Sequence, residues 1–248
     1  MSLSKEQIYE LMKNEKYPLS AKYDSDWIIE NQMGSHCLWL LEALVGRMDI
    51  KPGMRILDMG CGKAISSIFL AKEFGVQVWA NDLWISATEN WTRICKEGVD
   101  NLVFPIQAEA HSLPYAENFF DAVVSINSFQ FYGTDNYYMN KYFAKILKPG
   151  GQIGIVVPGL YKEFIGGIPD YLKSLWHPDF LSWHSPDWWK KHWNQTGVVT
   201  VQLADTFDNN EGYNMFKKFG LIINGGDKLI EADQGRNISF VRVLAQKN

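Results

Sequence analysis

A short apolar run followed by two closely spaced glycines constrains the fold of this chain more than any other feature. The run is Met54–Met59, the glycines are Gly60 and Gly62, and an apolar helical pattern over residues 64–74 follows directly. Glycine adopts backbone angles that other residues avoid, so this pair allows a tight turn between a buried strand and a helix. A strand, a glycine turn and a helix in this order predict an α/β fold.

The alternation of strand and helix patterns continues along the chain. Further strands are expected over residues 76–80, 103–108, 120–125 and 152–157, and helices over residues 86–96 and 137–147. Short connections between such elements predict a mostly parallel sheet with helices on both faces. Helical spacing is also found over residues 26–48, 187–195 and 213–219. The last two strands, expected over residues 198–207 and 238–245, are predicted to pair antiparallel at the sheet edge.

Composition and charge exclude several classes of function. The 248 residues carry 24 Lys and Arg against 28 Asp and Glu, which argues against a protein that binds nucleic acid by neutralising phosphates. No apolar run approaches the roughly 18 residues of a membrane span, and the N-terminal segment has no signal-peptide core. Neither the three cysteines nor His177, His184 and His192 have the spacing of a metal site. We therefore expect a cytoplasmic protein with no metal, no nucleic-acid partner and no stable membrane association.

The glycine turn is also a predicted ligand site. A glycine pair lets the backbone approach a ligand closely, and Asp82, at the end of the next strand, lies where a carboxylate can accept hydrogen bonds from a ribose diol. The dinucleotide fingerprint requires a third glycine where this chain has Ile65. Acidic residues at positions 58, 82 and 109 would repel phosphates but suit hydroxyls, an amine and a cationic sulfur. These observations argue against NAD.

Four sequence motifs in order give the chain a resemblance to a known family. They are ILDMGCGKA, NDLW, IQAEAHSLPYAENFFDAVVS and ILKPGGQIGIVVP. Over residues 54–158 the chain resembles the class I S-adenosylmethionine-dependent methyltransferases, in particular the branch acting on small molecules. The resemblance implies a Rossmann-like, doubly wound, mostly parallel seven-stranded sheet with a reversed last strand. Within one such domain we expect an N-terminal helical cap (1–50), a cofactor-binding core (51–158), an aromatic lid segment (159–197) and closing strands (198–248).

The resemblance implies S-adenosyl-L-methionine as the cofactor and assigns residues to it. Gly60 and Gly62 would approach its methionine part and Asp58 would order their loop. Around the nucleoside, the resemblance implies a ribose contact at Asp82, an adenine face covered by Leu83 or Trp84, and an adenine amino contact at Glu109 beside Ala110. Around the sulfonium it implies Tyr23, Ser125 and Asn127.

The acceptor site is expected in the segments before the first strand and after the fifth. Trp189 and Trp193 lie four residues apart on a predicted helix, with His192 beside them. Two interpretations stay open: these side chains pack the helix onto the sheet, or they line the acceptor pocket as an apolar wall. Methyl transfer by in-line displacement needs no enzyme nucleophile. A general base, if one is used, is expected among His111, Tyr132 and His184.

The sequence therefore predicts a methyltransferase that acts on a small-molecule acceptor. Three alternatives remain: an NAD-dependent oxidoreductase, an enzyme that uses the same cofactor for another reaction such as lipid cyclopropanation, and a non-catalytic S-adenosylmethionine sensor. The absent third glycine counts against the first, and the lack of a Lys/Arg cluster counts against the second. The methylated atom, the acceptor and the oligomeric state are not predicted by the sequence.

Overall fold

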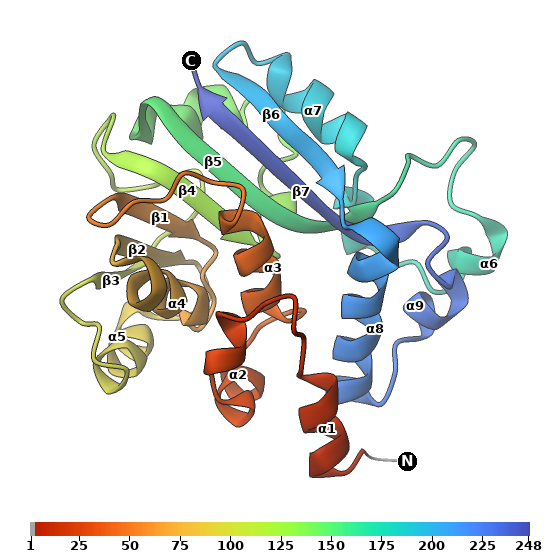
Figure 1. Ribbon diagram of the computed structural model, residues 1–248. Helices are drawn as coiled ribbons and strands as arrows, with labels where there is room; N and C mark the ends of the chain where they lie inside the picture. The colour runs from red at the N-terminus through yellow and green to blue at the C-terminus, as the bar shows by residue number, and fades with distance from the viewer. Residues whose placement is uncertain (1–2) are drawn as a thin grey trace.

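One mixed sheet of seven strands runs through the whole molecule in the computed structural model, which describes residues 3–248 apart from the side chain of Asn224 (Figure 1). The strand order is β3-β2-β1-β4-β5-β7-β6, and only β7 runs antiparallel to its neighbours. This order and the reversed last strand confirm the predicted fold. The strands are β1 Arg55–Met59, β2 Gln77–Asp82, β3 Val103–Gln107, β4 Phe120–Ile126, β5 Leu147–Leu160, β6 Val199–Thr206 and β7 Ile238–Lys247.

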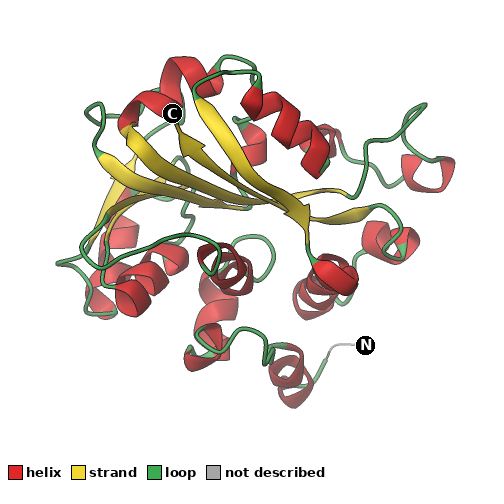
Figure 2. Ribbon diagram, turned by 45° about the horizontal axis from the view of Figure 1, so that its top comes forward, coloured by secondary structure: helices red, strands yellow, loops and turns green. Residues whose placement is uncertain are grey.

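Helices cover both faces of the sheet (Figure 2). They are α1 Lys5–Leu11, α2 Ser25–Asn31, α3 Cys37–Val45, α4 Ile65–Phe74, α5 Ala87–Lys96, α6 Asp170–Lys173, α7 Pro186–Asn194, α8 Glu211–Asn224 and α9 Lys228–Asp233. Short 3-10 turns cover Ser20–Lys22, Phe129–Phe131, Ala144–Ile146, Pro178–Ser182 and Asp208–Asn210, and a π-helical turn covers Met139–Phe143. Within residues 3–248, no helix combines the length and the apolar character needed to cross a membrane.

Two apolar clusters lie on opposite faces of the sheet because successive strand side chains point to opposite sides. Ile56 of β1 packs in the cluster that contains α3 and α4, whereas its neighbour Leu57 packs in the cluster that contains α7. Both residues are fully buried. Burial on both faces explains why the strands read as continuous apolar runs rather than as an alternation of apolar and polar residues.

The helical pattern expected over residues 26–48 is interrupted in the structure, and the interruption matters for the site. The helical pattern is divided into α2 and α3, and residues 32–36 connect them. Gly34 has a φ of +82°, which a helix does not contain. The side-chain amide of Asn127, after β4, donates to the carbonyl of Ser35 at 3.3 Å. This connection brings the end of α2 over the carboxyl ends of the central strands.

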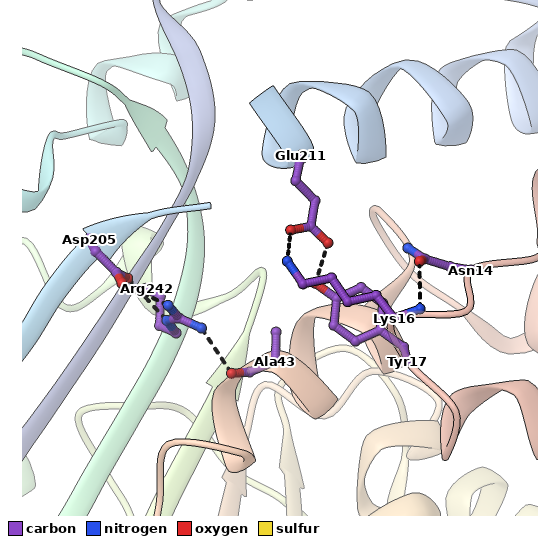
Figure 3. Close-up of polar contacts among 7 residues, drawn as sticks. All are labelled: Asn14, Lys16, Tyr17, Ala43, Asp205, Glu211 and Arg242. Carbon is purple, nitrogen blue, oxygen red and sulfur yellow. Dashed lines mark hydrogen bonds and ion pairs between the residues drawn. The ribbon is translucent and has the colours of Figure 1, made fainter. Parts of the chain in front are cut away.

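Polar contacts tie the N-terminal segment to the end of the chain (Figure 3). Glu211, at the start of α8, forms an ion pair with Lys16 and accepts a hydrogen bond of 2.6 Å from the Tyr17 hydroxyl. Arg242 of β7 donates two hydrogen bonds to the Asp205 carboxylate and a third, of 3.0 Å, to the carbonyl of Ala43 in α3. The segment that precedes β1 is therefore fixed to the start of α8 and to β7.

Candidate functional site

A cavity opens at the carboxyl ends of β1, β2 and β4, the edge at which open α/β sheets bind ligands. Five segments that are distant in sequence line it. They contribute Asn31, Gln32, Met33 and Cys37 from the N-terminal helices; Met59, Gly60, Cys61, Gly62, Ile65 and Ser66 from the loop after β1; Asn81, Asp82, Leu83 and Trp84 from the end of β2; Ala108, Glu109 and Ala110 after β3; and Ile126, Asn127, Ser128, Phe131 and Tyr132 after β4.

The loop after β1 requires its glycines. Gly60 and Gly62 have φ values of +73° and +54°, in the left-handed region that side chains disfavour. A Cβ at Gly60 would overlap Ser128, and one at Gly62 would lie 3.1 Å from the Met33 sulfur. The carbonyl of Asn81 in β2 accepts the N–H groups of Gly60 and Cys61 at 2.8 and 3.0 Å. The loop is therefore held open beside the cavity by the neighbouring strand.

Asp82 is the hydrogen-bonding centre of the cavity wall. Its Oδ1 accepts the backbone N–H groups of Trp84 and Ile85 at 2.8 and 3.0 Å, and its Oδ2 accepts that of Gly62 at 2.8 Å. An ionised carboxylate has about four acceptor positions, so about one position on Oδ2 remains for a ligand hydroxyl. Asp82 therefore orders two loops and offers one contact, rather than the pair of contacts expected for a ribose diol.

Asp58 lies beneath the glycine loop and outside the cavity lining. Its Oδ2 accepts the hydroxyls of Ser66 and Ser67 at 2.5 and 2.6 Å, and its Oδ1 has no partner. Burial raises the pKa of Asp58 to about 6, and the two serine hydroxyls oppose that rise. This position at the start of α4 suits the loop-ordering role that the resemblance implies.

Glu109 lines the cavity, but both of its carboxylate oxygens already face His111. One accepts the His111 backbone N–H at 2.7 Å and the other lies 2.8 Å from the ring Nδ1. Although burial alone would raise it, these hydrogen bonds lower the pKa of Glu109. His111 itself is outside the lining, with its Nε2 3.9 Å from the Asp135 carboxylate. In this arrangement His111 orients Glu109 and does not reach the cavity as a base.

The segment after β4 supplies polar groups to the cavity. Asn127 has a φ of +58°, and its Oδ1 is buried without a partner. Both amide atoms of Gln32, which faces the same cavity from the end of α2, are also buried and unpartnered. Tyr132 lies within hydrogen-bond distance of Ser125 and of the Met59 carbonyl, at 3.3 Å each. Burial raises the pKa of Tyr132, so its hydroxyl stays protonated.

Besides Asp58 and His111, three further residues expected at the site, Tyr23, Ser125 and His184, lie outside the cavity lining. Ser125 is fully buried and donates to the Met59 carbonyl at 2.7 Å. Tyr23 stacks on Trp27 and has its hydroxyl 3.3 Å from Glu73, so Met33 and not Tyr23 is the N-terminal side chain at the glycine loop. His184 stacks on Trp188 with ring centres 3.6 Å apart and belongs to no wall of the cavity.

The acceptor-pocket interpretation of the α7 side chains is wrong. Trp189 and Trp193 are 0% exposed and pack with Phe129 in the cluster beneath the sheet. The ring Nε2 of His192 lies 3.0 Å from the carbonyl of Gly133. These side chains fix α7 to the sheet, which was the other interpretation, and none of the three can contact an acceptor in this conformation.

Sequence reasoning missed part of the lining. Asn31, Gln32, Met33 and Cys37 reach the cavity because the chain leaves helical geometry between α2 and α3. Gly34, within an otherwise helical pattern, was the feature that could have revealed this break. Phe131 also lines the cavity. It lies between the third and fourth sequence motifs, and its neighbouring residues gave no sign of a ligand contact.

The chemistry of the lining fits a ligand with hydroxyls, an amine and positive charge. Among the described residues, the lining has two carboxylates, Asp82 and Glu109, and no Lys, Arg or His. The unpartnered oxygen of Asn127 requires a hydrogen-bond donor. Leu83 and Trp84 expose 52% and 72% of their surface at the cavity and offer flat or apolar contacts to a base. A diphosphate would meet no cation here.

Comparisons with known proteins agree with this chemistry. A family profile described as "Methyltransferase domain" matches residues 56–151. The demethylmenaquinone methyltransferase of Bacillus cereus is 30% identical over 213 residues, which cover 82% of this chain and 84% of that protein. The glycine/sarcosine/dimethylglycine N-methyltransferase of Actinopolyspora halophila is 29% identical over 170 residues, 66% of this chain. The chain spans less than half the length of some of its curated relatives, 29% of this last protein and 42% of the Streptomyces halstedii methyltransferase GfsG.

Solved structures share the fold. A phosphoethanolamine N-methyltransferase of Haemonchus contortus in complex with S-adenosyl-L-methionine aligns with a TM-score of 0.70 at 19% identity, over 97% of this chain and 60% of that one. A geranyl diphosphate methyltransferase in complex with the same cofactor aligns with a TM-score of 0.67 at 16% identity, over 85% of each chain. At these identities the likeness concerns the arrangement of helices and strands.

Proposed function

The chain belongs to the class I S-adenosylmethionine-dependent methyltransferases, and on that premise we propose that it methylates a small-molecule acceptor at the cavity formed by the ends of β1, β2 and β4. One observation carries this proposal: the glycine loop, Asp82 and the end of β4 meet in a single cavity whose lining has carboxylates but no cation among the described residues. When bound, S-adenosylmethionine supplies an electrophilic methyl group on a sulfonium whose positive charge matches that lining.

We assign the cofactor contacts to the residues that line the cavity. The backbone of Gly60 and Gly62 lines the cavity and is assigned to the amino-acid end of the cofactor. The free position on Asp82 Oδ2 accepts one ribose hydroxyl. Leu83, Trp84 and Ala110 provide the apolar walls for the adenine. Asp58 acts through the loop, which it holds by way of Ser66 and Ser67.

Positioning is the main catalytic contribution that this chain offers. The carboxylates of Asp82 and Glu109 are engaged by backbone or His111 N–H groups, and the Tyr132 hydroxyl stays protonated. All three groups are thus engaged in contacts within the protein. Alignment of two reactants in a closed site can supply roughly 7–11 kcal/mol of the barrier reduction, so a base is not required for an acceptor that already has a free lone pair. The Tyr132 hydroxyl donates to the Met59 carbonyl and accepts from the Ser128 hydroxyl, at 3.3 Å each.

Two alternatives are weaker on specific grounds. An NAD-dependent enzyme would place a diphosphate beside the glycine loop, which lacks the third glycine of the dinucleotide fingerprint and has no neighbouring cation in the described lining. A lipid-modifying enzyme of the same cofactor class needs a membrane-facing basic or apolar surface, and the predicted acceptor is instead a dissolved small molecule. A non-catalytic sensor would share the cavity and bind the cofactor, so turnover separates it from an enzyme.

Two measurements test the proposal. Calorimetric titration with S-adenosylhomocysteine should show binding in the micromolar range, and titration with NAD should show none. Incubation with methyl-deuterated S-adenosylmethionine and a panel of amines, phenols and quinols should give a labelled product detected by mass spectrometry. Binding of NAD, or of neither nucleotide, would contradict the proposed cofactor site. Binding of S-adenosylhomocysteine without turnover over the whole panel would favour the sensor.

A further inference from the structure

Buried polar atoms without partners gather where two short segments meet. Within residues 3–248, ten buried side-chain nitrogen or oxygen atoms have no hydrogen-bond partner in the protein, and five of them belong to residues 32–36 and 127–130. These five are Gln32 Nε2 and Oε1, His36 Nε2, Asn127 Oδ1 and Gln130 Oε1. Folded proteins leave few buried polar atoms unpaired, so their concentration in one place indicates a function.

The two segments are in contact with each other. The Asn127 amide nitrogen donates to the Ser35 carbonyl at 3.3 Å, and a Cβ at Gly34 would lie 3.2 Å from the same nitrogen. The Gln130 amide nitrogen donates to the Asn127 backbone carbonyl at 3.2 Å. In the part of the chain that the structure describes, the bond from Asn127 to Ser35 is the only hydrogen bond between the two segments. Separating them to admit a ligand therefore breaks a single hydrogen bond.

The cofactor cavity accounts for two of these four side chains. Gln32 and Asn127 belong to its lining, so a bound cofactor can supply their hydrogen-bond partners. His36 and Gln130 lie outside the lining and are only 3% and 2% exposed. Methyl transfer places a second molecule, the acceptor, in contact with the cofactor. The acceptor is therefore the molecule that can supply partners to His36 and Gln130.

The hydrogen-bonding roles of His36 and Gln130 are fixed by their other contacts. His36 Nδ1 accepts the Trp39 N–H at 3.3 Å at the start of α3, which places the ring proton on Nε2. Burial lowers the pKa of His36 to about 3, so the ring is neutral and Nε2 is a donor. Gln130 uses its amide nitrogen on Asn127, which leaves Oε1 as an acceptor. The two side chains thus offer one neutral donor and one neutral acceptor.

We propose that His36 and Gln130 form an acceptor subsite that binds a hydroxyl or carboxamide group, because such a group both accepts and donates hydrogen bonds. This inference rests on the proposed function and names the chemistry of its acceptor. The bound group accepts from His36 Nε2 and donates to Gln130 Oε1, and so removes the cost of leaving two buried atoms unpaired. An ether or a hydrocarbon in the same place would leave at least one of them without a partner.

The binding test uses benzamide and benzyl alcohol as probes, and toluene as the probe that lacks the polar group. An aryl ring suits this place, since Trp39 stacks on His36 with ring centres 3.8 Å apart. Each probe is titrated into the whole chain with and without saturating S-adenosylhomocysteine, and ligand-observed NMR gives its dissociation constant. We expect both polar probes to bind at least about tenfold more tightly than toluene. Equal binding of toluene, or failure of both polar probes to bind, would overturn the inference.

Two variants assign the binding to the named atoms. His36→Asn keeps an oxygen that can accept the Trp39 N–H but removes Nε2, and Gln130→Met removes Oε1 at nearly the same side-chain length. Each should weaken benzamide binding at least about tenfold and leave S-adenosylhomocysteine affinity unchanged. With any acceptor that is methylated, both should raise the KM of that acceptor and not that of S-adenosylmethionine. Unchanged benzamide binding in both variants would overturn the inference, and so would unfolding of both, because the two groups would then serve the fold.

His177→Asn and Gln202→Met are the matched controls. His177 also begins a helical turn, Pro178–Ser182, by accepting the Asp179 N–H at its Nδ1, but its side chain is 63% exposed. Gln202 is exposed, and its amide nitrogen donates to Gln246. Both controls should bind benzamide as the unmodified protein does, and an equal loss in controls and subsite variants would overturn the inference. Failure of S-adenosylhomocysteine to bind would contradict the proposed function, whereas the probe titrations without it decide the subsite separately.

Discussion

The glycine loop after β1 and the helix α7 place opposite demands on their side chains. Gly60 and Gly62 use positive φ angles and the absence of a side chain to bring the backbone to the edge of a cavity. Helix α7 is regular and begins after Ser185, which accepts the Trp188 N–H at 3.3 Å. It buries two of its three tryptophans, Trp189 and Trp193. The loop contributes its backbone to the wall of the cavity, whereas the helix contributes buried side chains to the core.

This difference separates two quantities that one mutation can change, ligand affinity and folding stability. Substitutions of Gly60 or Gly62 should act mainly on cofactor binding, because a new Cβ meets Ser128 or Met33 and shifts the wall of the cavity. Substitutions on the buried face of α7 should act mainly on stability, because they leave a cavity in the core. A loop variant that changes only stability, or an α7 variant that changes only cofactor affinity, would contradict this distinction.

Trp189→Ala should give the largest effect, a loss of about 3–5 kcal/mol in the free energy of unfolding. Trp189 is 0% exposed, so truncation leaves a large void between α7 and the sheet. Urea unfolding measures the loss, with Trp188→Ala as the control because Trp188 is only partly buried. S-adenosylhomocysteine affinity should be unchanged for the folded fraction. If stability were unchanged and S-adenosylhomocysteine binding were weakened, Trp189 would be a ligand contact and not a core residue.

Gly60→Ala should weaken S-adenosylhomocysteine binding by at least about 100-fold, or about 2.7 kcal/mol. The added methyl group would overlap Ser128 and force the loop to shift at the cavity wall. Gly53→Ala is the matched control, because Gly53 has a similar φ of +80° but no atom within 4 Å of its added Cβ. Calorimetry should show normal affinity for the control. Similar losses in both variants would mean that backbone strain alone, and not the site, is responsible.

Asp82→Asn should weaken S-adenosylhomocysteine binding by about tenfold or more. Asparagine keeps one acceptor oxygen, so either the Gly62 N–H or the N–H groups of Trp84 and Ile85 face an amide nitrogen that cannot accept them. A hydrogen bond to a charged acceptor contributes about 1.5–3 kcal/mol. Asp100→Asn, at an exposed acid, makes the same change in net charge and serves as the control. Equal affinities for Asp82→Asn and the unmodified protein would remove Asp82 from the cofactor site.

Asp58 should give the smallest effect, a pH dependence of stability. Its pKa is raised by burial to about 6 in the folded protein, above the unfolded value near 3.8. The folded state therefore holds the proton more tightly, and the contribution of Asp58 falls by about 1 kcal/mol per pH unit as the pH rises from 4 to 6. Comparing unfolding free energies with those of Asp58→Asn isolates this contribution. The account is contradicted if the stability of the unmodified protein relative to Asp58→Asn stays constant, or rises, between pH 4 and pH 6.

The parts of the fold and the site that could be predicted from the sequence are those fixed by residues close to one another along the chain. Gly60, Gly62 and Asp82 are recognisable because a turn after a strand and an acid at the next strand end are fixed by short stretches of backbone. The seven strands and the reversed last strand followed from the family resemblance, and the helix expected over residues 187–195 matches α7, which begins after the capping residue Ser185.

The remaining errors come from tertiary packing. A tryptophan pair on a helix has the same spacing whether it faces a core or a ligand, so Trp189 and Trp193 could not be placed from their pattern. The path of residues 32–36 depends on contacts with Asn127, which lies far along the chain. Hydrogen bonds between side chains, such as that between His111 and Glu109, are decided by the same packing.

The most direct test of this account is hydrogen–deuterium exchange with and without S-adenosylhomocysteine. Saturating ligand should slow exchange in residues 31–37, in residues 59–66 and in residues 82–85, which line or adjoin the cavity. Exchange in α7 should not change, since its tryptophans pack against the sheet. Protection of α7 together with unchanged exchange in the glycine loop would contradict the account, because it would place the cofactor against the aromatic helix.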